Sequence, residues 1–261
     1  MTPAIISPYS NKVDEQQSGY AHLDVGWCRA VACTWAAAAV AEALDGQTLY
    51  EWAARQPVKE KMHGRGVIHS VDLPTSPATA VVVRRNCHGG LLRNLTGEYF
   101  LAPTRAPLEL ATYLRLAAAG VPTAEVIAYA VYPVAGIFAR SDVMTRRLPE
   151  GGDFPAVWEK AGNAERDQIL VAVRRLLDAL VSAGGWHADL NLKNIYIAGS
   201  GTDPTAYLLD VDRVTFPGGC DIAARNFKRL AQSARKWRTR WGLDFTEDSL
   251  ARLAPGAEEK K

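Results

Sequence analysis

The sequence predicts a two-lobed α+β protein, because its first part is rich in strand-like segments and its second part is rich in helices. A Pro- and Gly-containing stretch, RLPEGGDFP at 147–155, lies between the two parts and is interpreted as a linker. The 261 residues, of which 48% are hydrophobic and 22% charged, are enough to form a sizeable core. We expect an N-terminal extension with a helix at 1–45, an N-lobe at 46–147 and a C-lobe at 148–261.

The first expected elements are one helix and two strands. Residues 1–24 are polar and turn-rich, so we expect them to be loosely ordered. The alanine-rich segment WCRAVACTWAAAAVAEAL at 27–44 predicts a helix. The segments GRGVIHSV (64–71) and TAVVVRR (79–85) predict strands, and the Pro and Ser of DLPTSP between them mark a turn.

A helix and two more strands complete the expected N-lobe. Residues 106–120 carry apolar side chains on one helical face and end at a glycine, Gly120, which predicts a helix. Strands are expected around 124–132 and 136–145. The first lobe is therefore predicted to be mainly a sheet with one long helix.

The C-lobe is predicted to contain a long helix, a hairpin and a basic helical end. Residues 164–185 place apolar side chains at helical spacing. The segments NIYIA and AYLLDV flank the polar stretch GSGTDPT and predict a β-hairpin. From about residue 221 the chain reads as helical and basic.

Composition excludes several classes of protein. The formal net charge is only +2 and no nucleic-acid-binding motif is present, so nucleic acid is not an expected partner. The longest apolar stretch, AAAAVAEAL at 36–44, is shorter than the roughly 20 residues that a membrane span requires. No signal peptide is recognised, and four scattered cysteines without a C-x-x-C pair predict reduced, packed thiols. We therefore expect a cytoplasmic protein.

One polar motif, at 187–194, has the spacing of a site for phosphoryl transfer. In GWHADLNLKNIYIAG, His187 precedes Asp189 by two residues and Asn194 follows after four more. Asp189 can accept a proton from a hydroxyl group, while Asn194 and Asp210, at the end of the hairpin, can offer oxygen ligands to Mg²⁺. We expect a structural role for His187, which would hold the loop by hydrogen bonds. Asp and Asn beside a strand are also common cap and turn residues, so the motif alone leaves that alternative open.

The same segments resemble a known family. HADLNLKN is similar to the catalytic loop H-R-D-x-x-x-x-N of the protein-kinase-like superfamily, and Asp210 falls where the aspartate of D-F-G would lie. HADLNLKNIYI together with YLLDVDRVTF resembles the bacterial lipopolysaccharide kinases, above all those acting on 3-deoxy-D-manno-octulosonic acid (Kdo). The resemblance extends from about residue 60 to 240, through VVVRRNCHGGLL, PLELATYLRLAAAGVPTAEVIAY, SDVMTRRLP and ARNFKRLAQSARK.

This resemblance implies a bilobal protein-kinase-like fold and roles for the residues of the motif. Asp189 would be the catalytic base, and Asn194 and Asp210 would be the metal ligands. The chain departs from the protein-kinase pattern because Asp212 replaces the glycine of D-F-G and no A-P-E motif follows. A protein substrate is therefore not expected.

The resemblance also implies a nucleotide-phosphate site in the N-lobe. Glu109 is placed like the glutamate that pairs with a strand cation, and Arg84 is favoured over Arg85 as that cation. An arginine can bind phosphates in bidentate fashion. Gly64 and Gly66 would let the backbone approach the phosphates of ATP.

The implied activity is transfer of the γ-phosphoryl group of ATP, with Mg²⁺, to a hydroxyl of Kdo in the lipopolysaccharide inner core. The resemblance implies O-4 as the hydroxyl and Kdo-lipid A as the acceptor. Arg213 is expected to bind the acceptor carboxylate, by charge complementarity. The alternatives are another small-molecule kinase of the same fold, of heptose or aminoglycoside type, and a lipid-binding pseudokinase.

The basic segment NFKRLAQSARKWRTRW at 226–241 allows two interpretations. Its apolar residues share one helical face, and its six cations occupy the rest: Lys228, Arg229, Arg235, Lys236, Arg238 and Arg240. It is either a packed helix with a solvated basic side or a surface that attracts the anionic inner membrane. The second interpretation predicts a peripheral protein on the cytoplasmic face of that membrane; the sequence does not indicate an oligomeric state.

Overall fold

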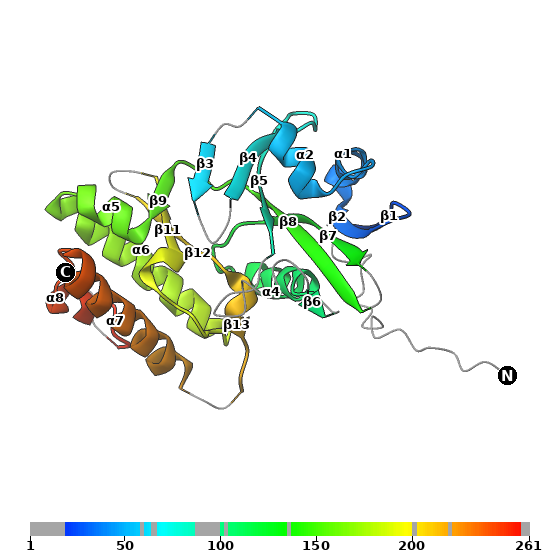
Figure 1. Ribbon diagram of the computed structural model, residues 1–261. Coiled ribbons are helices and arrows are strands. Elements are labelled where there is room, and N and C mark those ends of the chain that lie inside the picture. The colour runs from blue at the N-terminus through cyan, green and yellow to red at the C-terminus, as the bar shows by residue number, and fades with distance from the viewer. Residues whose placement is uncertain are drawn as a thin grey trace. The chain divides into compact units, whose positions relative to one another are not determined.

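The computed structural model describes residues 19–57, 60–63, 67–86, 100–101, 104–134, 137–199, 203–218 and 221–256 (Figure 1). Contacts divide the chain into a β-rich unit, Met1–Leu110 with Val126–Arg147, and a mostly helical unit, Ala111–Glu125 with Leu148–Lys261. Strands and helices are therefore largely segregated, and the predicted α+β class is confirmed. Gly64 and Gly66 lie outside the described residues.

The β-rich unit contains an antiparallel sheet (Figure 1). Its strand order is β1-β2-β7-β8-β5-β4-β3, and β6 pairs with β8 off this path. The strands are β1 (Tyr20–Asp24), β2 (Arg29–Cys33), β3 (Glu60–His63), β4 (Val67–Leu73), β5 (Thr79–Arg85), β6 (Phe100–Leu101), β7 (Val126–Val134) and β8 (Phe138–Arg146).

Strand β5 coincides with the strand predicted at 79–85, because its β-branched residues alternate in burial. Val81 and Val83 are fully buried, and they lie opposite Val71 of β4 and Met144 of β8. Strands β7 and β8 likewise follow the predictions at 124–132 and 136–145 to within two residues. Side chains from several strands thus form the core against which this unit's helices pack.

The prediction for the N-terminal segment was wrong in two respects. The helix expected at 27–44 begins as strand β2, and helical structure starts only with the 3-10 turn η2 (Thr34–Ala36) and continues in α1 (Ala37–Ala43). Tertiary pairing overrides alanine's helix propensity here, because β2 pairs with both β1 and β7. Within 1–24, which was expected to be loosely ordered, residues 20–24 form β1.

Two further helices belong wholly or partly to this unit. The short helix α2 (Leu49–Arg55) begins with a capping box, in which Thr48 and Glu51 satisfy each other's backbone N–H groups. The helix predicted at 106–120 is α4 (Ala106–Ala118), and the boundary between the units falls within it, after Leu110.

The mostly helical unit combines long helices with short strands. The predicted hairpin is confirmed, because Ile195 pairs with Leu208 and Ala198 with Thr205. The elements of this unit that follow α4 are β9 (Gly151–Asp153), α5 (Phe154–Lys160), α6 (Asn163–Ser182), β10 (Trp186–His187), η3 (Leu192–Asn194), β11 (Ile195–Ala198), β12 (Thr205–Leu208), η4 (Val211–Arg213), β13 (Val214–Thr215), α7 (Ile222–Trp241) and α8 (Glu247–Ala251).

The segment interpreted as a linker is ordered structure. Gly151–Asp153 forms β9, which pairs with β11, and Asp153 caps α5 by accepting a hydrogen bond from the Ala156 N–H. A Cβ atom at position 151 would lie 2.0 Å from the Ile197 carbonyl oxygen, so only glycine allows this close approach of the backbones.

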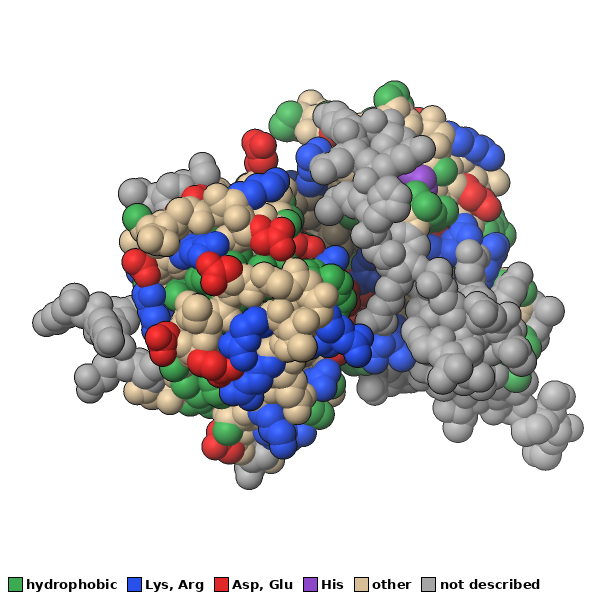
Figure 2. Space-filling model, turned by 60° about the vertical axis from the view of Figure 1, so that its left-hand side comes forward, with side chains coloured by type: hydrophobic (Ala, Val, Ile, Leu, Met, Phe, Trp, Pro, Cys, Tyr) green, Lys and Arg blue, Asp and Glu red, His purple; other side chains and the backbone are tan. Residues whose placement is uncertain are grey.

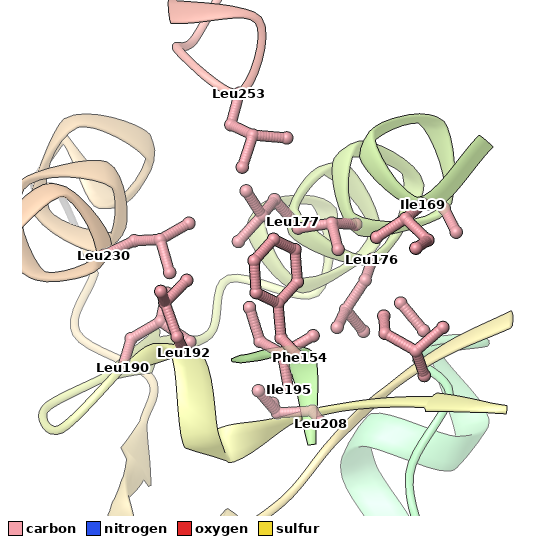
Figure 3. Close-up of a cluster of buried hydrophobic side chains, with 14 of the residues drawn as sticks. Phe154, Ile169, Leu176, Leu177, Leu190, Leu192, Ile195, Leu208, Leu230 and Leu253 are labelled. Carbon is pink, nitrogen blue, oxygen red and sulfur yellow. The ribbon is translucent and has the colours of Figure 1, made fainter. Parts of the chain in front are cut away.

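The core of this unit joins the predicted helix α6, the hairpin and α7. Leu190 and Leu192, from the loop between β10 and β11, are fully buried and face Leu230 of α7 (Figure 3). Phe154 and Leu176 lie in the same cluster. Burial of two leucines anchors the polar loop between β10 and β11 to the helical core.

Candidate active site

The polar loop predicted from the sequence, residues 187–194, connects β10 to η3 and β11. Its leucines at 190 and 192 are buried in the core, whereas the side chain of Asp189 is 35% exposed. This alternation fixes the loop by its apolar residues and leaves a carboxylate accessible to a ligand.

His187 is fully buried and organises the loop. Its Nδ1 accepts a hydrogen bond from the Asp189 backbone N–H at 3.1 Å, and its Nε2 lies 3.1 Å from the Leu209 carbonyl oxygen. Because Nδ1 accepts, the proton belongs on Nε2, which donates to Leu209. Burial lowers the pKa of His187, although the neighbouring Asp210 and Asp189 oppose the shift, so the neutral ring is favoured.

Two amide side chains converge on the carbonyl oxygen of Asp189. The Nδ2 atoms of Asn191 and Asn194 donate to this oxygen at 3.0 and 2.9 Å. Since its Nδ2 is used in this way, Asn194 has its Oδ1 as the atom with which it can bind a cation. The loop thereby holds both its exposed carboxylate and one amide oxygen in fixed positions.

Asp210 lies next to Asn194 because of the hairpin register. The backbone N–H of Leu209 donates to the Asn194 carbonyl at 2.8 Å. Asp210 has φ 53° and ψ 46°, and among the described residues it is the only non-glycine residue with positive φ. Such a backbone is unfavourable for most side chains and is concentrated at functional sites.

The donor set of these two residues fits Mg²⁺. A carboxylate and an amide oxygen are hard ligands, and Mg²⁺ is commonly held by one or two such groups together with phosphate oxygens and water. Within the described residues, no group of three or more His, Cys, Asp or Glu side chains is placed to hold a metal ion.

Helix α7 supports the loop through a row of side chains that the sequence analysis did not identify. Asn226, which is buried, accepts from the His187 N–H at 3.0 Å and donates to the Gly185 carbonyl at 2.9 Å. Ser233 accepts a hydrogen bond from the Leu192 N–H at 3.1 Å. The spacing of these positions is helical, so one face of α7 contacts the loop along its length.

Arg229 lies in the same row and contacts Asp189 directly. Its Nη2 donates to Asp189 Oδ1 at 2.9 Å. The side chain of Arg229 is 41% exposed and that of Asp189 is 35% exposed. Both interpretations of the sequence placed Arg229 with the cations outside the apolar face, and neither predicted its contact with Asp189. Its spacing of three residues from Asn226 and four from Ser233 was the signal that could have indicated this contact.

Arg213 contacts the loop through its backbone. Its carbonyl accepts from the Ala188 N–H at 3.0 Å, while its guanidinium Nε is 3.9 Å from Asp212. The contacts described for its side chain do not include Asp189.

The predicted phosphate-site residues of the β-rich unit form their own cluster. Arg84 Nη2 donates to Glu109, which is 3% exposed, and Arg84 Nη1 donates to Asn86 at 2.9 Å. Arg85 instead lies 3.7 Å from the buried Asp142. The buried glutamate therefore pairs with the arginine that the sequence analysis favoured.

Comparisons with known proteins identify the family. The model of the lipopolysaccharide kinase (Kdo/WaaP) family matches residues 50–255. A 3-deoxy-D-manno-octulosonic acid kinase of Haemophilus influenzae is 26% identical over 77% of this chain and 85% of its own length. A 3-deoxy-D-manno-octulosonic acid kinase of Stenotrophomonas maltophilia is 30% identical over 77% of this chain and 79% of its own length. A solved structure of WaaP in complex with acyl carrier protein aligns over 80% of this chain and 81% of that chain, with 15% identity and a TM-score of 0.49.

The family model and the related kinase sequences define a class of enzyme, a phosphotransferase that acts on an alcohol group. More particularly, the chain belongs to the lipopolysaccharide kinase (Kdo/WaaP) family, as the sequence resemblance predicts.

Proposed function

We propose that the protein transfers the γ-phosphoryl group of ATP to O-4 of Kdo in Kdo-lipid A. The observation that carries the proposal is the position of the Asp189 carboxylate, which is partly exposed on a loop that buried leucines and hydrogen bonds hold in place. The activity named for the relatives supports Kdo as the acceptor.

Asp189 is the proposed catalytic base. Its carboxylate accepts the proton of the acceptor hydroxyl while that oxygen forms the new bond to the γ-phosphorus atom. The bond from this phosphorus to the bridging oxygen breaks at the same time, and ADP leaves. Asn194 and Asp210 would hold Mg²⁺ through their side-chain oxygens, and bound Mg²⁺ would neutralise charge on the phosphates.

The ion pair of Arg84 with Glu109 is proposed to present the arginine to the nucleotide phosphates. A buried carboxylate fixes the guanidinium from one side, and a guanidinium can bind phosphate oxygens in bidentate fashion. The backbone at Gly64 and Gly66 is proposed to approach the same phosphates. In this scheme Arg213 is the sequence-predicted partner of the acceptor carboxylate.

We also propose that helix α7 brings the enzyme to the cytoplasmic face of the inner membrane. No described helix is long and apolar enough to span a bilayer. The face turned forward in Figure 2 carries many Lys and Arg side chains with Asp and Glu among them. Arg235 and Arg238 both pair with Glu247, whereas Lys228, Lys236 and Arg240 are exposed. These three cations are the better candidates for binding anionic lipid.

The function is tested by incubating the protein with radiolabelled ATP, Mg²⁺ and Kdo-lipid A. Label should enter Kdo-lipid A but not lipid A that lacks Kdo, and Asp189→Asn should abolish transfer while Mg²⁺-dependent ATP binding persists. Heptose-containing and aminoglycoside acceptors test the alternative kinases. Mg²⁺–ATP binding without transfer to any of these acceptors would favour a pseudokinase and refute the proposal.

Membrane attachment is tested by co-sedimentation with vesicles of anionic lipid. Each cation near such a surface contributes roughly 1 kcal/mol, so replacing Lys228, Lys236 and Arg240 by Gln should weaken binding about 100-fold. Replacing Arg235 and Arg238 should have a smaller effect, because Glu247 already offsets their charge. Binding that persists in the triple variant, or that is unaffected by salt, would refute the proposal.

A further inference from the structure

We infer that Arg229 binds the carboxylate of the acceptor sugar while it holds the Asp189 side chain. The inference rests on the proposed function, in which Asp189 receives the proton of the acceptor hydroxyl and the acceptor carries a carboxylate. It assigns the recognition of that carboxylate to α7 and not to Arg213.

Arg229 lies beside the position that the acceptor hydroxyl must occupy. An acceptor hydroxyl must lie within hydrogen-bond distance of the Asp189 carboxylate for proton transfer. The Nη2 of Arg229 is 2.9 Å from the same carboxylate, so a sugar that reaches Asp189 also lies beside this guanidinium. Arg229 keeps 41% of its side-chain exposure, which leaves a surface for a ligand.

The guanidinium of Arg229 has enough N–H donors for both Asp189 and an acceptor carboxylate. A guanidinium has five N–H groups. One Nη2 hydrogen is used by Asp189, and Nη1 has only a long contact of 3.4 Å with the exposed Gln232. The Nε of Arg229 is buried and has no hydrogen-bond partner among the described residues, so it is not accessible to a ligand. One hydrogen on each Nη therefore remains, and together they can bind a carboxylate end-on through two parallel bonds.

The positive charge of Arg229 offsets the repulsion that an anionic acceptor would meet. An acceptor carboxylate near Asp189 would place two negative charges close together in a site that also binds anionic phosphates. Like charges at such separations repel strongly unless a cation lies between them. Arg229 already pairs with Asp189, so the same cation can offset both charges. Neutral sugars would gain nothing from this arrangement, and Arg229 would thus select anionic acceptors.

The rival cation is less well placed for this task. The guanidinium of Arg213 lies against its sequence neighbour Asp212, and its described contacts do not include the Asp189 side chain. Arg225, one turn before Arg229 on α7, stacks on Trp186 with 3.7 Å between its Cζ and the ring centroid. Of these three arginines, Arg229 is the one for which the structure describes a contact with the Asp189 carboxylate.

The test combines a change in the enzyme with a change in the acceptor. The parent and Arg229→Gln are each assayed with Kdo-lipid A and with the methyl ester of its Kdo carboxylate. A charge-assisted bond to a carboxylate predicts that the parent prefers the free acid roughly 10- to 100-fold in kcat/KM. Arg229→Gln should reduce this preference to within a few-fold of unity. Any loss of Asp189 positioning lowers kcat for both acceptors equally and cancels in the ratio.

Two more variants make the outcome specific. Arg229→Lys keeps the charge but loses the planar pair of donors, so it should retain part of the preference. Arg175→Gln removes an arginine of α6 that is 70% exposed, and it should leave the preference unchanged. Because Arg229 is itself half-exposed, we expect Arg229→Gln to fold, and Mg²⁺–ATP binding checks this.

Three results would overturn the inference. The first is a parent enzyme that phosphorylates the ester as efficiently as the acid. The second is a preference that survives Arg229→Gln but disappears in Arg213→Gln, which would assign recognition to Arg213. The third is a parent that binds Mg²⁺–ATP but phosphorylates neither Kdo acceptor, which would overturn the proposed function together with this inference.

Discussion

Asp142 is a buried carboxylate of the β-rich unit, and we expect it to make the stability of this unit depend on pH. It is 1% exposed on β8, and its Oδ2 accepts hydrogen bonds from the Tyr132 hydroxyl and the Tyr50 N–H, both at 3.0 Å. Burial raises the pKa of Asp142 to about 6, although these bonds and the nearby Arg85 and Arg140 oppose the shift.

The direction and size of the effect follow from linkage. The folded state keeps the proton of Asp142 up to about pH 6, whereas the unfolded chain loses it near the ordinary value of 3.8. Between these values the folded state binds more protons, so the free energy of unfolding falls as pH rises. The slope is at most about 1.4 kcal/mol per pH unit, and because each state titrates partly at the ends of this range, the loss from pH 4 to pH 6 is about 2 kcal/mol. The contribution levels off above about pH 7.

The assay compares the parent with Asp142→Asn, whose amide oxygen can still accept the two hydrogen bonds. Hydrogen exchange of the β7 and β8 amides, measured from pH 4 to pH 7 after correction for intrinsic rates, reports opening of this unit alone. The difference in opening free energy should shift by about 2 kcal/mol in favour of the variant across this range. Asp203→Asn, at a side chain that is 90% exposed, is the control and should give no such shift. Parallel profiles for parent and Asp142→Asn would refute the argument that burial controls this carboxylate.

Three further predictions concern the candidate site and the hairpin. Asp210→Asn, which tolerates the left-handed backbone, should abolish Mg²⁺-dependent turnover and leave the circular dichroism spectrum unchanged; undiminished transfer would exclude Asp210 as a ligand. Substitutions of Arg84 and Glu109 should be non-additive in kcat/KM by about 0.5–3 kcal/mol in a double-mutant cycle, whereas additive losses would mean that the pair does not act as a unit. Gly151→Ala should lower the free energy of unfolding by about 1–3 kcal/mol, because the new methyl group meets the Ile197 carbonyl; an unchanged urea midpoint would contradict this.

The elements that could be predicted from the sequence are those whose local pattern agrees with their tertiary environment. β5 is an example, because its valines alternate in burial between two partner strands. The helix predicted at 27–44 was wrong in its first part. The alanines of this segment favour a helix, whereas pairing with β1 and β7 makes residues 29–33 a strand. Alanine fits either structure, so the decision depends on neighbours that are distant in sequence.

The candidate site also has a part that could be predicted from the sequence and a part that could not. The spacing of His187, Asp189 and Asn194, followed by Asp210 after a hairpin, is a local pattern, and the hairpin register brings these residues together. The contacts made by α7 could not be predicted, because Arg229 is 40 residues from Asp189 in the chain. A cation beside apolar helix positions usually faces solvent, and only the packing of α7 against the loop shows otherwise.

Helix α7 therefore carries two sets of side chains whose effects can be separated. Asn226, Arg229 and Ser233 contact the 187–194 loop, whereas Lys236 and Arg240, further along the same helical face, are exposed. A substitution in the first set should alter turnover with soluble nucleotide present in excess, while one in the second set should alter only attachment to anionic vesicles. If α7 served solely as a packing helix, both sets would change stability and neither would change turnover or attachment selectively. In the proposed scheme the same helix would connect acceptor recognition at Asp189 with attachment to the membrane, because the side chains proposed for both tasks lie on one helix.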